Sequence, residues 1–220
     1  TASVMAAPGA VVISKMLVPQ VDSVNQEIKV TKEKVCANIL DAITNGTSEG
    51  IKLAVNVAGM LLVFIAFIAL FNFMIDDLLG RYTGINKWVV RITDGQYQGF
   101  SLQFILGYLF SPIMWLLGVA KEDITLVGRL LGEKIILNEF VAFSHLNEYL
   151  AGMSPRTFAV TTFSLCGFAN LSSIAILLGG LGVLVPEKRE LIGQFGIKAV
   201  LAASLSNLMS AALAGIMLTF

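Results

Sequence analysis

Three long runs without a charged residue constrain this sequence more than any other feature. They extend over 53–75, 157–185 and 199–220, and none contains Asp, Glu, Lys or Arg. A helix needs about 20 apolar residues to cross the roughly 30 Å hydrocarbon core of a bilayer, and each run is at least that long. Only 14% of all residues are charged, against about 25% in soluble domains. The sequence therefore predicts an all-α polytopic protein that lies in the lipid bilayer.

The first part of the chain adds a shorter span and a polar segment. Its uncharged beginning, with Lys15 extending an ammonium to the interface, predicts a transmembrane helix over 1–18 that ends before Pro19. No basic residues precede the apolar part, so it is not a signal peptide, and a chain that opens on Thr1 rather than Met is expected to be part of a longer protein. Residues 19–52 are polar, and their lysines favour the cytoplasmic side.

Two further segments are apolar but do not fit straight spans. Residues 102–118 contain Pro112 and the interfacial aromatic Trp115, which predicts an amphipathic helix that lies on the outer face of the membrane. Residues 121–149 contain two apolar pieces that are each too short to cross, which predicts a re-entrant hairpin.

The run over 157–185 is longer than a straight span requires. Its middle contains Gly167, Asn170, Ser172 and Ser173, which are poor helix formers. This composition favours a broken transmembrane helix whose freed backbone groups face a polar cavity. The alternative is a continuous helix in which the small residues allow close packing against neighbouring helices.

Glu139 is an acid inside the apolar run of KIILNEFVAF, and Asn138 is the only polar residue beside it. A charged side chain near the centre of a membrane costs at least about 2.5 to 3.5 kcal/mol on insertion scales, so such an acid indicates a functional site that faces protein or water. The alternative is that Glu139 is solvated, or that it forms a purely structural pair with Lys134 or Arg129.

Three functions are compatible with these groups. Asn170 and Ser173 would share a helix face, and with the Glu139 carboxylate they suit a small polar solute that is rich in hydroxyl groups. The protein is then a transporter, an intramembrane enzyme that acts on a small polar substrate, or a non-transporting structural membrane subunit. An enzyme would be expected to show a second acid, a histidine or a metal set near Glu139, and a structural subunit would not need a polar pair opposite the acid. We therefore expect a transporter with no catalytic residue and no cofactor.

Other features exclude several classes of partner. Fifteen basic and fifteen acidic residues cancel, so nothing resembles the basic surface of a nucleic-acid binder. The two cysteines, Cys36 and Cys166, lack metal-ligand spacing. His145 is the single histidine, and without a cluster of ligating residues it is expected to be structural or interfacial. We expect no metal site on this chain.

Three motifs together resemble the C-terminal half of the concentrative nucleoside transporter family. They are TASVMAAP at 1–8, NEFVAF at 138–143 and LCGFANLSSIAILLGGLGVLVPEKRE at 165–190, and the resemblance covers essentially the whole chain. It implies an inverted-repeat secondary transporter, a homotrimer in the plasma membrane, or in the inner membrane of a bacterium, that imports nucleosides with a sodium or proton gradient by alternating access. The implied parts are a transmembrane helix at 1–18, a cytoplasmic segment at 19–52, a long scaffold helix at 53–79, an outer interfacial helix at 102–118, a re-entrant hairpin at 121–149, a broken helix at 157–185 and a last transmembrane helix at 189–220.

The resemblance also implies roles for individual residues. Glu139 and Asn170 match positions that form hydrogen bonds with ribose hydroxyls, Ser173 matches a further ribose contact, and Phe168 matches an aromatic residue that lies against the base. Asn138 is a candidate accessory contact.

The resemblance places other parts of the transporter outside this chain. The ligands of the coupling ion, Na⁺ or H⁺, and a second hairpin that contacts the base would lie upstream of Thr1. Preference for purine or pyrimidine stays open.

Overall fold

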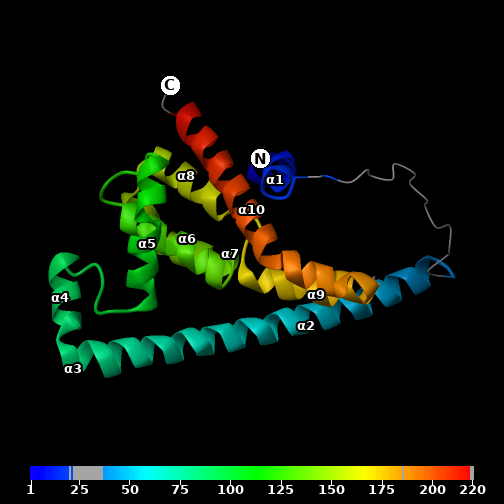
Figure 1. Cartoon of the computed structure of the whole chain (residues 1–220), viewed down its shortest axis with the longest axis horizontal. Helices are drawn as coiled ribbons and strands as arrows, with labels where there is room; N and C mark the ends of the chain where they lie inside the picture. Colours follow the sequence, from blue (N-terminus) through cyan, green and yellow to red (C-terminus); the bar gives the residue numbers. More distant parts are fainter. Residues whose placement is uncertain (20, 22–36, 185, 219–220) are drawn as a thin grey trace.

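The fold was analysed in a computed structural model, which describes residues 1–19, 21, 37–184 and 186–218. Every regular element in these ranges is a helix, so the all-α prediction is confirmed. The elements, shown in Figure 1, are α1 (Ala2–Leu17), α2 (Ile39–Asn72), the π-helix η1 (Phe73–Gly80), α3 (Arg81–Thr83), α4 (Ile85–Ile92), α5 (Leu102–Leu116), α6 (Ile124–Ile136), α7 (Glu139–Tyr149), the 3₁₀ turn η2 (Leu150–Gly152), α8 (Pro155–Leu165), α9 (Leu171–Leu184), the 3₁₀ turn η3 (Pro186–Lys188) and α10 (Arg189–Met217).

The first helix, α1, begins directly after Thr1. The side chain of Thr1 makes no capping hydrogen bond, but its backbone carbonyl accepts from the N–H groups of Val4 and Met5, both at 3.1 Å. The helix ends at Leu17, so the segment 1–18 is helical over 16 residues. It is one of the shorter apolar helices of the chain, and its crossing of a membrane stays a prediction.

The long helix α2 begins earlier than its uncharged run. Asn38 caps its first turn, because the Asn38 side chain accepts a hydrogen bond from the backbone N–H of Asp41 at 2.8 Å, and the Asp41 carboxylate lies at the positive end of the helix. The helix therefore starts at Ile39, inside the segment 19–52 that we expected to be polar and cytoplasmic. It continues through η1 and runs along one side of the molecule (Figure 1). Residues 22–36 of that segment lie outside the described residues.

A polar corner fastens the end of α2 to the following helices. Asn72 accepts a hydrogen bond from the backbone N–H of Leu102 at 2.8 Å and donates one to the side chain of Gln103 at 2.9 Å. The side chain of Asn86, on α4, donates to the Asp76 carboxylate and accepts from the backbone of the loop that leads to α5. These side chains satisfy backbone groups at a sharp change of direction, so the start of α5 is held against the end of α2.

Helices α5 and α6 approach one another closely because both present glycine. A Cβ atom added at Gly128 would lie 2.5 Å from the carbonyl oxygen of Gly107 and 3.2 Å from the backbone nitrogen of Ser111. The obstructing atoms are backbone, which cannot move aside as the end of a side chain can. The remaining face of α5 exposes Tyr108 and Trp115, and the expected position of α5 at the outer membrane face stays a prediction.

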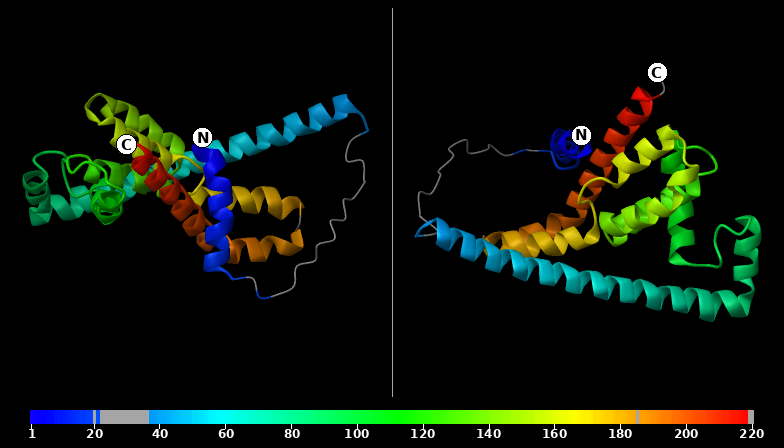
Figure 2. Two further views of the ribbon diagram at one scale, coloured as in Figure 1. Left: turned by 90° about the horizontal axis from the view of Figure 1, so that it is seen from above. Right: turned by 180° about the vertical axis from the view of Figure 1, so that it is seen from behind.

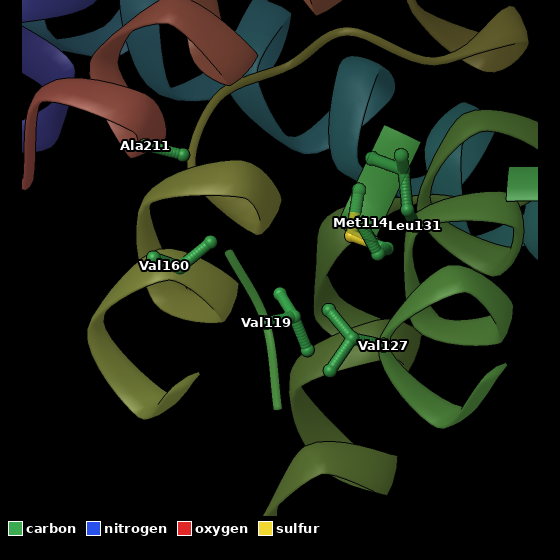
Figure 3. Packing of buried hydrophobic residues seen from close by; sticks show 6 residues of the cluster. All are labelled: Met114, Val119, Val127, Leu131, Val160 and Ala211. Atoms are coloured by element: carbon green, nitrogen blue, oxygen red, sulfur yellow. The ribbon is translucent and has the colours of Figure 1, made fainter. Parts of the chain in front are cut away.

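One apolar cluster joins four helices that are distant in sequence. Figure 3 shows its six buried side chains, which are Met114, Val119, Val127, Leu131, Val160 and Ala211. They come from α5 and the segment after it, α6, α8 and α10. Helix α6 is therefore packed into a core that it shares with α5, α8 and α10.

The last helix, α10, crosses the molecule beside α1 (Figures 1 and 2). Ser206 on α10 donates a hydrogen bond to the backbone carbonyl of Ala6 at 2.9 Å, and Gly9 on α1 is buried at the crossing. Among the residues whose side chains the structure describes, α10 is the one helix that is long and apolar enough to cross a membrane, and α1 and α5 are shorter apolar helices.

We predict that Gly128→Ala destabilises the protein, because its methyl group would push α5 and α6 apart. Such overpacking costs about 1–3 kcal/mol. The measurement is the thermal unfolding midpoint of the purified full-length protein. Gly46→Ala is the matched control, since a Cβ there meets nothing within 4 Å and should stabilise α2 by up to about 1 kcal/mol. Equal midpoints for the two variants would contradict the close packing.

Candidate functional site

The first part of the site is a break between α6 and α7. Helix α6 ends because Leu137 leaves the helical conformation, with φ −91° and ψ −93°. Asn138 is extended and caps α7, its side-chain oxygen accepting a hydrogen bond from the backbone N–H of Val141 at 3.0 Å. Glu139 therefore lies in the first turn of α7, where the helix dipole favours a negative charge.

The second part is a break between α8 and α9. Helix α8 ends at Leu165, and Gly167 follows with a φ of 105°, a conformation that other residues rarely adopt. Asn170 precedes α9, and its side-chain oxygen accepts from the backbone N–H of Ser173 at 2.7 Å, as a capping residue does. The run over 157–185 therefore forms two helices, and the alternative of one continuous helix is wrong.

The two breaks meet through their polar side chains. Asn170 donates from Nδ2 to Oε2 of Glu139 at 3.0 Å. Ser172 donates to the backbone carbonyl of Leu137 at 3.0 Å, so the second break also satisfies the backbone of the first. The hydroxyl of Ser173 lies 2.8 Å from Oδ1 of Asn170. The structure thus brings together Glu139, Asn170 and Ser173, which sequence reasoning singled out.

The two other candidates have different surroundings. Phe168 lies in the second break with its side chain 74% exposed, and its carbonyl accepts a hydrogen bond from Ser173 at 2.7 Å. Its ring is therefore available to a flat partner but does not contact the polar cluster through any recorded interaction. Asn138 is buried, and its side chain is engaged in capping α7. It supports Glu139 structurally.

Glu139 does not form a direct ion pair with either suggested cation. Within the described residues, Arg129 pairs with Glu133, and Lys134 donates to the backbone carbonyl of Ser164 at 3.0 Å. The recorded hydrogen-bond partner of the Glu139 carboxylate is the neutral amide of Asn170. The purely structural pairing that the sequence left open is thus not what the structure contains.

Sequence reasoning missed a second polar cluster on the same hairpin. The Glu133 carboxylate, whose side chain is 4% exposed, accepts from Nε of Arg129 at 2.9 Å and lies 2.7 Å from Nδ1 of His145. The Arg129–Glu133 pair has the i, i+4 spacing of a helix, which was a usable signal. The contact with His145 joins α6 to α7, and no local spacing marks it. His145 is thus a structural residue that fastens the two helices.

The side chains that the structure describes form no ion site of clustered ligands. The described residues contain no group of three or more His, Cys, Asp or Glu placed to hold a metal ion. The family resemblance implies that the ligands of the coupling ion lie upstream of Thr1, outside this chain, and that stays a prediction.

Buried polar residues of α10 also reach the second break. The amide atoms of Asn207, a residue that is 3% exposed, would lie 3.0 and 3.1 Å from a Cβ added at Gly167. The nitrogen of that amide has no hydrogen-bond partner within the described structure. Asn207 lies in the last uncharged run, where a buried amide is a signal that the sequence analysis passed over.

Comparison with known families gives a match over almost the entire chain. The family described as "Na+ dependent nucleoside transporter C-terminus" matches residues 1–215. Curated relatives include the nucleoside permease NupC of Helicobacter pylori, which is 40% identical over 220 residues, or 98% of this chain and 49% of that protein. The human sodium/nucleoside cotransporter 1 is 37% identical over 235 residues, or 98% of this chain and 34% of that protein.

A third relative, the uncharacterized transporter YutK of Bacillus subtilis, is 42% identical over 97% of this chain and 50% of its own length. This chain therefore spans about half the length of the bacterial relatives that it matches. Among solved structures, CNTnw in an inward-facing substrate-bound state is 40% identical and superposes with a TM-score of 0.82 over 99% of this chain and 49% of that chain. A variant of CNTnw in an outward-facing state gives a TM-score of 0.80 at 40% identity over 100% of this chain and 50% of that chain.

We predict that Glu133→Gln lowers the stability of the protein. The substitution leaves the Arg129 guanidinium, whose side chain is 18% exposed, without its anion, and breaking a buried pair in this way costs about 3–5 kcal/mol. The thermal unfolding midpoint of the purified full-length protein measures the effect. The control is Glu148→Gln, on the exposed side of α7, which should change the midpoint little. A midpoint for Glu133→Gln equal to that of the control would show that the cluster does not stabilise the hairpin.

Proposed function

Because this chain belongs to the Na+ dependent nucleoside transporter family, we propose that the full-length protein imports nucleosides by coupling them to a cation gradient. The relatives NupC and sodium/nucleoside cotransporter 1 are nucleoside transporters, a class of membrane protein that is not enzymatic. The chain spans about half the length of its bacterial relatives. The substrate, the coupling ion and the assembly of the whole protein are accordingly parts of this proposal.

The contact between Glu139 and Asn170 carries the assignment of the site. An ionised carboxylate accepts hydrogen bonds from two neighbouring hydroxyls, which is the pattern that the 2′- and 3′-hydroxyls of a ribose present. Asn170 uses its side-chain oxygen to cap α9 and one of its two N–H groups to reach Glu139. Because Asn170 is 1% exposed, its second N–H would donate to a sugar only after the two breaks move apart. Ser173 adds a hydroxyl beside them.

The base would lie against Phe168. Its exposed ring offers an aromatic face next to the polar cluster, and stacking on such a face tolerates every nucleobase. In this arrangement the protein would recognise the ribose through hydrogen bonds and the base through shape and stacking. Selection between purine and pyrimidine would come from groups other than Phe168.

Transport would proceed by alternating access. The solved states of CNTnw include an inward-facing and an outward-facing one, which supports movement between two such states in this protein. The moving part would contain α6 to α9, where both breaks lie, and the scaffold would contain α2 in a homotrimer of the plasma membrane, or of the inner membrane in a bacterium. We place the ligands of the coupling ion, Na⁺ with H⁺ as the alternative, upstream of Thr1, in the half of the relatives that this chain does not match.

We predict that Glu139→Gln weakens nucleoside uptake by the full-length protein. A neutral amide replaces the charged acceptor of the ribose hydroxyls, and a hydrogen bond to a charged group contributes about 1.5–3 kcal/mol, or about tenfold to hundredfold in apparent affinity. Initial rates of uridine or adenosine uptake against concentration measure the effect, with Glu148→Gln as the control on the same helix. Unchanged affinity and rate would remove Glu139 from the site.

The coupling ion is tested on the unmodified full-length protein. If Na⁺ drives uptake, replacing sodium with choline at constant pH should abolish concentrative uptake. If H⁺ drives it, uptake should persist in choline and collapse when the pH gradient is removed. Concentrative uptake that survives removal of both gradients would contradict symport.

A further inference from the structure

We infer that Lys134 is a positioning residue for this site, which holds the tip of the α6–α7 hairpin against α8 and supplies the internal positive charge that keeps the Glu139 carboxylate in place. The inference rests on the proposed function, because the group that Lys134 positions is the proposed ribose acceptor. Lys134 itself does not contact the substrate in this proposal.

The burial of Lys134 requires an explanation. Its side chain is fully buried, and it is the largest fully buried side chain among the described residues. Removing an ammonium from water costs several kcal/mol even after the protein relaxes, unless partners compensate the charge. The recorded hydrogen bond to the carbonyl of Ser164 is one such partner, and a single neutral carbonyl is a weak one for a full charge.

Four helix ends offset the cost of removing the Lys134 ammonium and the Glu139 carboxylate from water. Lys134 lies in the last turn of α6, and Ser164 lies in the last turn of α8, so the ammonium is placed at two helix C-termini, whose carbonyls are partially negative. Glu139 lies in the first turn of α7 and contacts Asn170, which caps α9, so the carboxylate is placed at two helix N-termini. The cation and the anion therefore each lie at helix ends whose partial charge favours its sign.

The two charges also attract one another. Lys134 and Glu139 carry opposite charges, which attract in a medium of low dielectric, and no direct ion pair joins them in the described structure. They lie on either side of the break at Leu137, whose carbonyl is bound by Ser172 of the second break. In this proposal Lys134 acts on Glu139 across the break without contacting it, so the carboxylate keeps oxygen lone pairs for the ribose.

A buried apolar cluster joins the helices that the Lys134 hydrogen bond links. Leu130, Ala142, Leu146 and Leu165 form a buried apolar cluster that joins α6, α7 and the end of α8. Leu165 is next to Ser164, so the carbonyl that receives the ammonium is itself held by this cluster. The link is thus a stable one between the hairpin and the broken helix.

The test compares ligands that differ only in the ribose hydroxyls. Equilibrium dissociation constants are measured for the purified full-length protein with uridine or adenosine, and with the matching 2′,3′-dideoxynucleoside. The dissociation constant of the dideoxynucleoside divided by that of the nucleoside reports how strongly the protein binds the two hydroxyls. Lys134→Met removes the charge, Lys134→Gln removes the charge but keeps an N–H donor, and Lys134→Arg keeps the charge.

We expect both neutral variants to reduce this ratio by about tenfold or more, because the loss falls on the charge-assisted hydrogen bonds to the hydroxyls. Lys134→Arg should retain most of the ratio. A purely structural role would weaken both ligands equally and leave the ratio unchanged, and that result overturns the inference.

Further outcomes separate a folding defect, and a failure of the proposed ribose site at Glu139, from a failure of this inference. If neither neutral variant folds, Lys134→Met combined with Glu139→Gln should recover folded protein, because no lone charge is then buried. If the double variant does not fold either, the inference is overturned.

If the unmodified protein does not distinguish the two ligands, or Glu139→Gln leaves the ratio unchanged, the proposed site fails. If Glu139→Gln abolishes the ratio while Lys134→Gln preserves it, this inference alone fails.

Discussion

The structure depends on two interrupted helices that satisfy one another. A helix that breaks inside apolar surroundings leaves backbone and side-chain polar groups without water to bind, and each such group costs free energy unless it is paired. Here Ser172 of the second break binds the carbonyl of Leu137 in the first, and Lys134 of the hairpin binds the carbonyl of Ser164 before the second. Neither break is satisfied alone, so the two must form together.

This mutual pairing is supported by close packing behind it. The glycine contact between α5 and α6 brings their backbones together, and the apolar cluster that includes Val160 and Ala211 ties α6 to α8 and α10. The hairpin and the broken helix are therefore parts of one packed body. The side chain of Asn72, at the end of α2, is in turn bound to the start of α5.

The sequence predicted the parts of the site that break a local rule. Glu139 is an acid in an apolar stretch, and Asn170 with Ser173 interrupts an uncharged run, so each was visible without a structure. The contacts of Lys134 and His145 were not visible, because their partners lie on helices whose approach no local spacing encodes. The start of α2 was missed for a different reason: a cap at Asn38 extends the helix into polar residues, while hydropathy marks only its apolar part.

The hydrogen bond between Asn170 and Glu139 bears on how a site of this kind both binds and releases its ligand. An unpaired carboxylate in low dielectric would be costly, and the Asn170 amide together with two helix N-termini offsets that cost. In the proposed site, a ribose would compete with this internal bond, so only part of its gross interaction energy would appear as affinity. On release, the carboxylate would return to its hydrogen bond with Asn170 rather than to an empty apolar pocket. A transporter that must release its substrate on the far side of the membrane benefits from a carboxylate that already has a hydrogen-bond partner. A site built for the tightest binding would not contain such a competing partner.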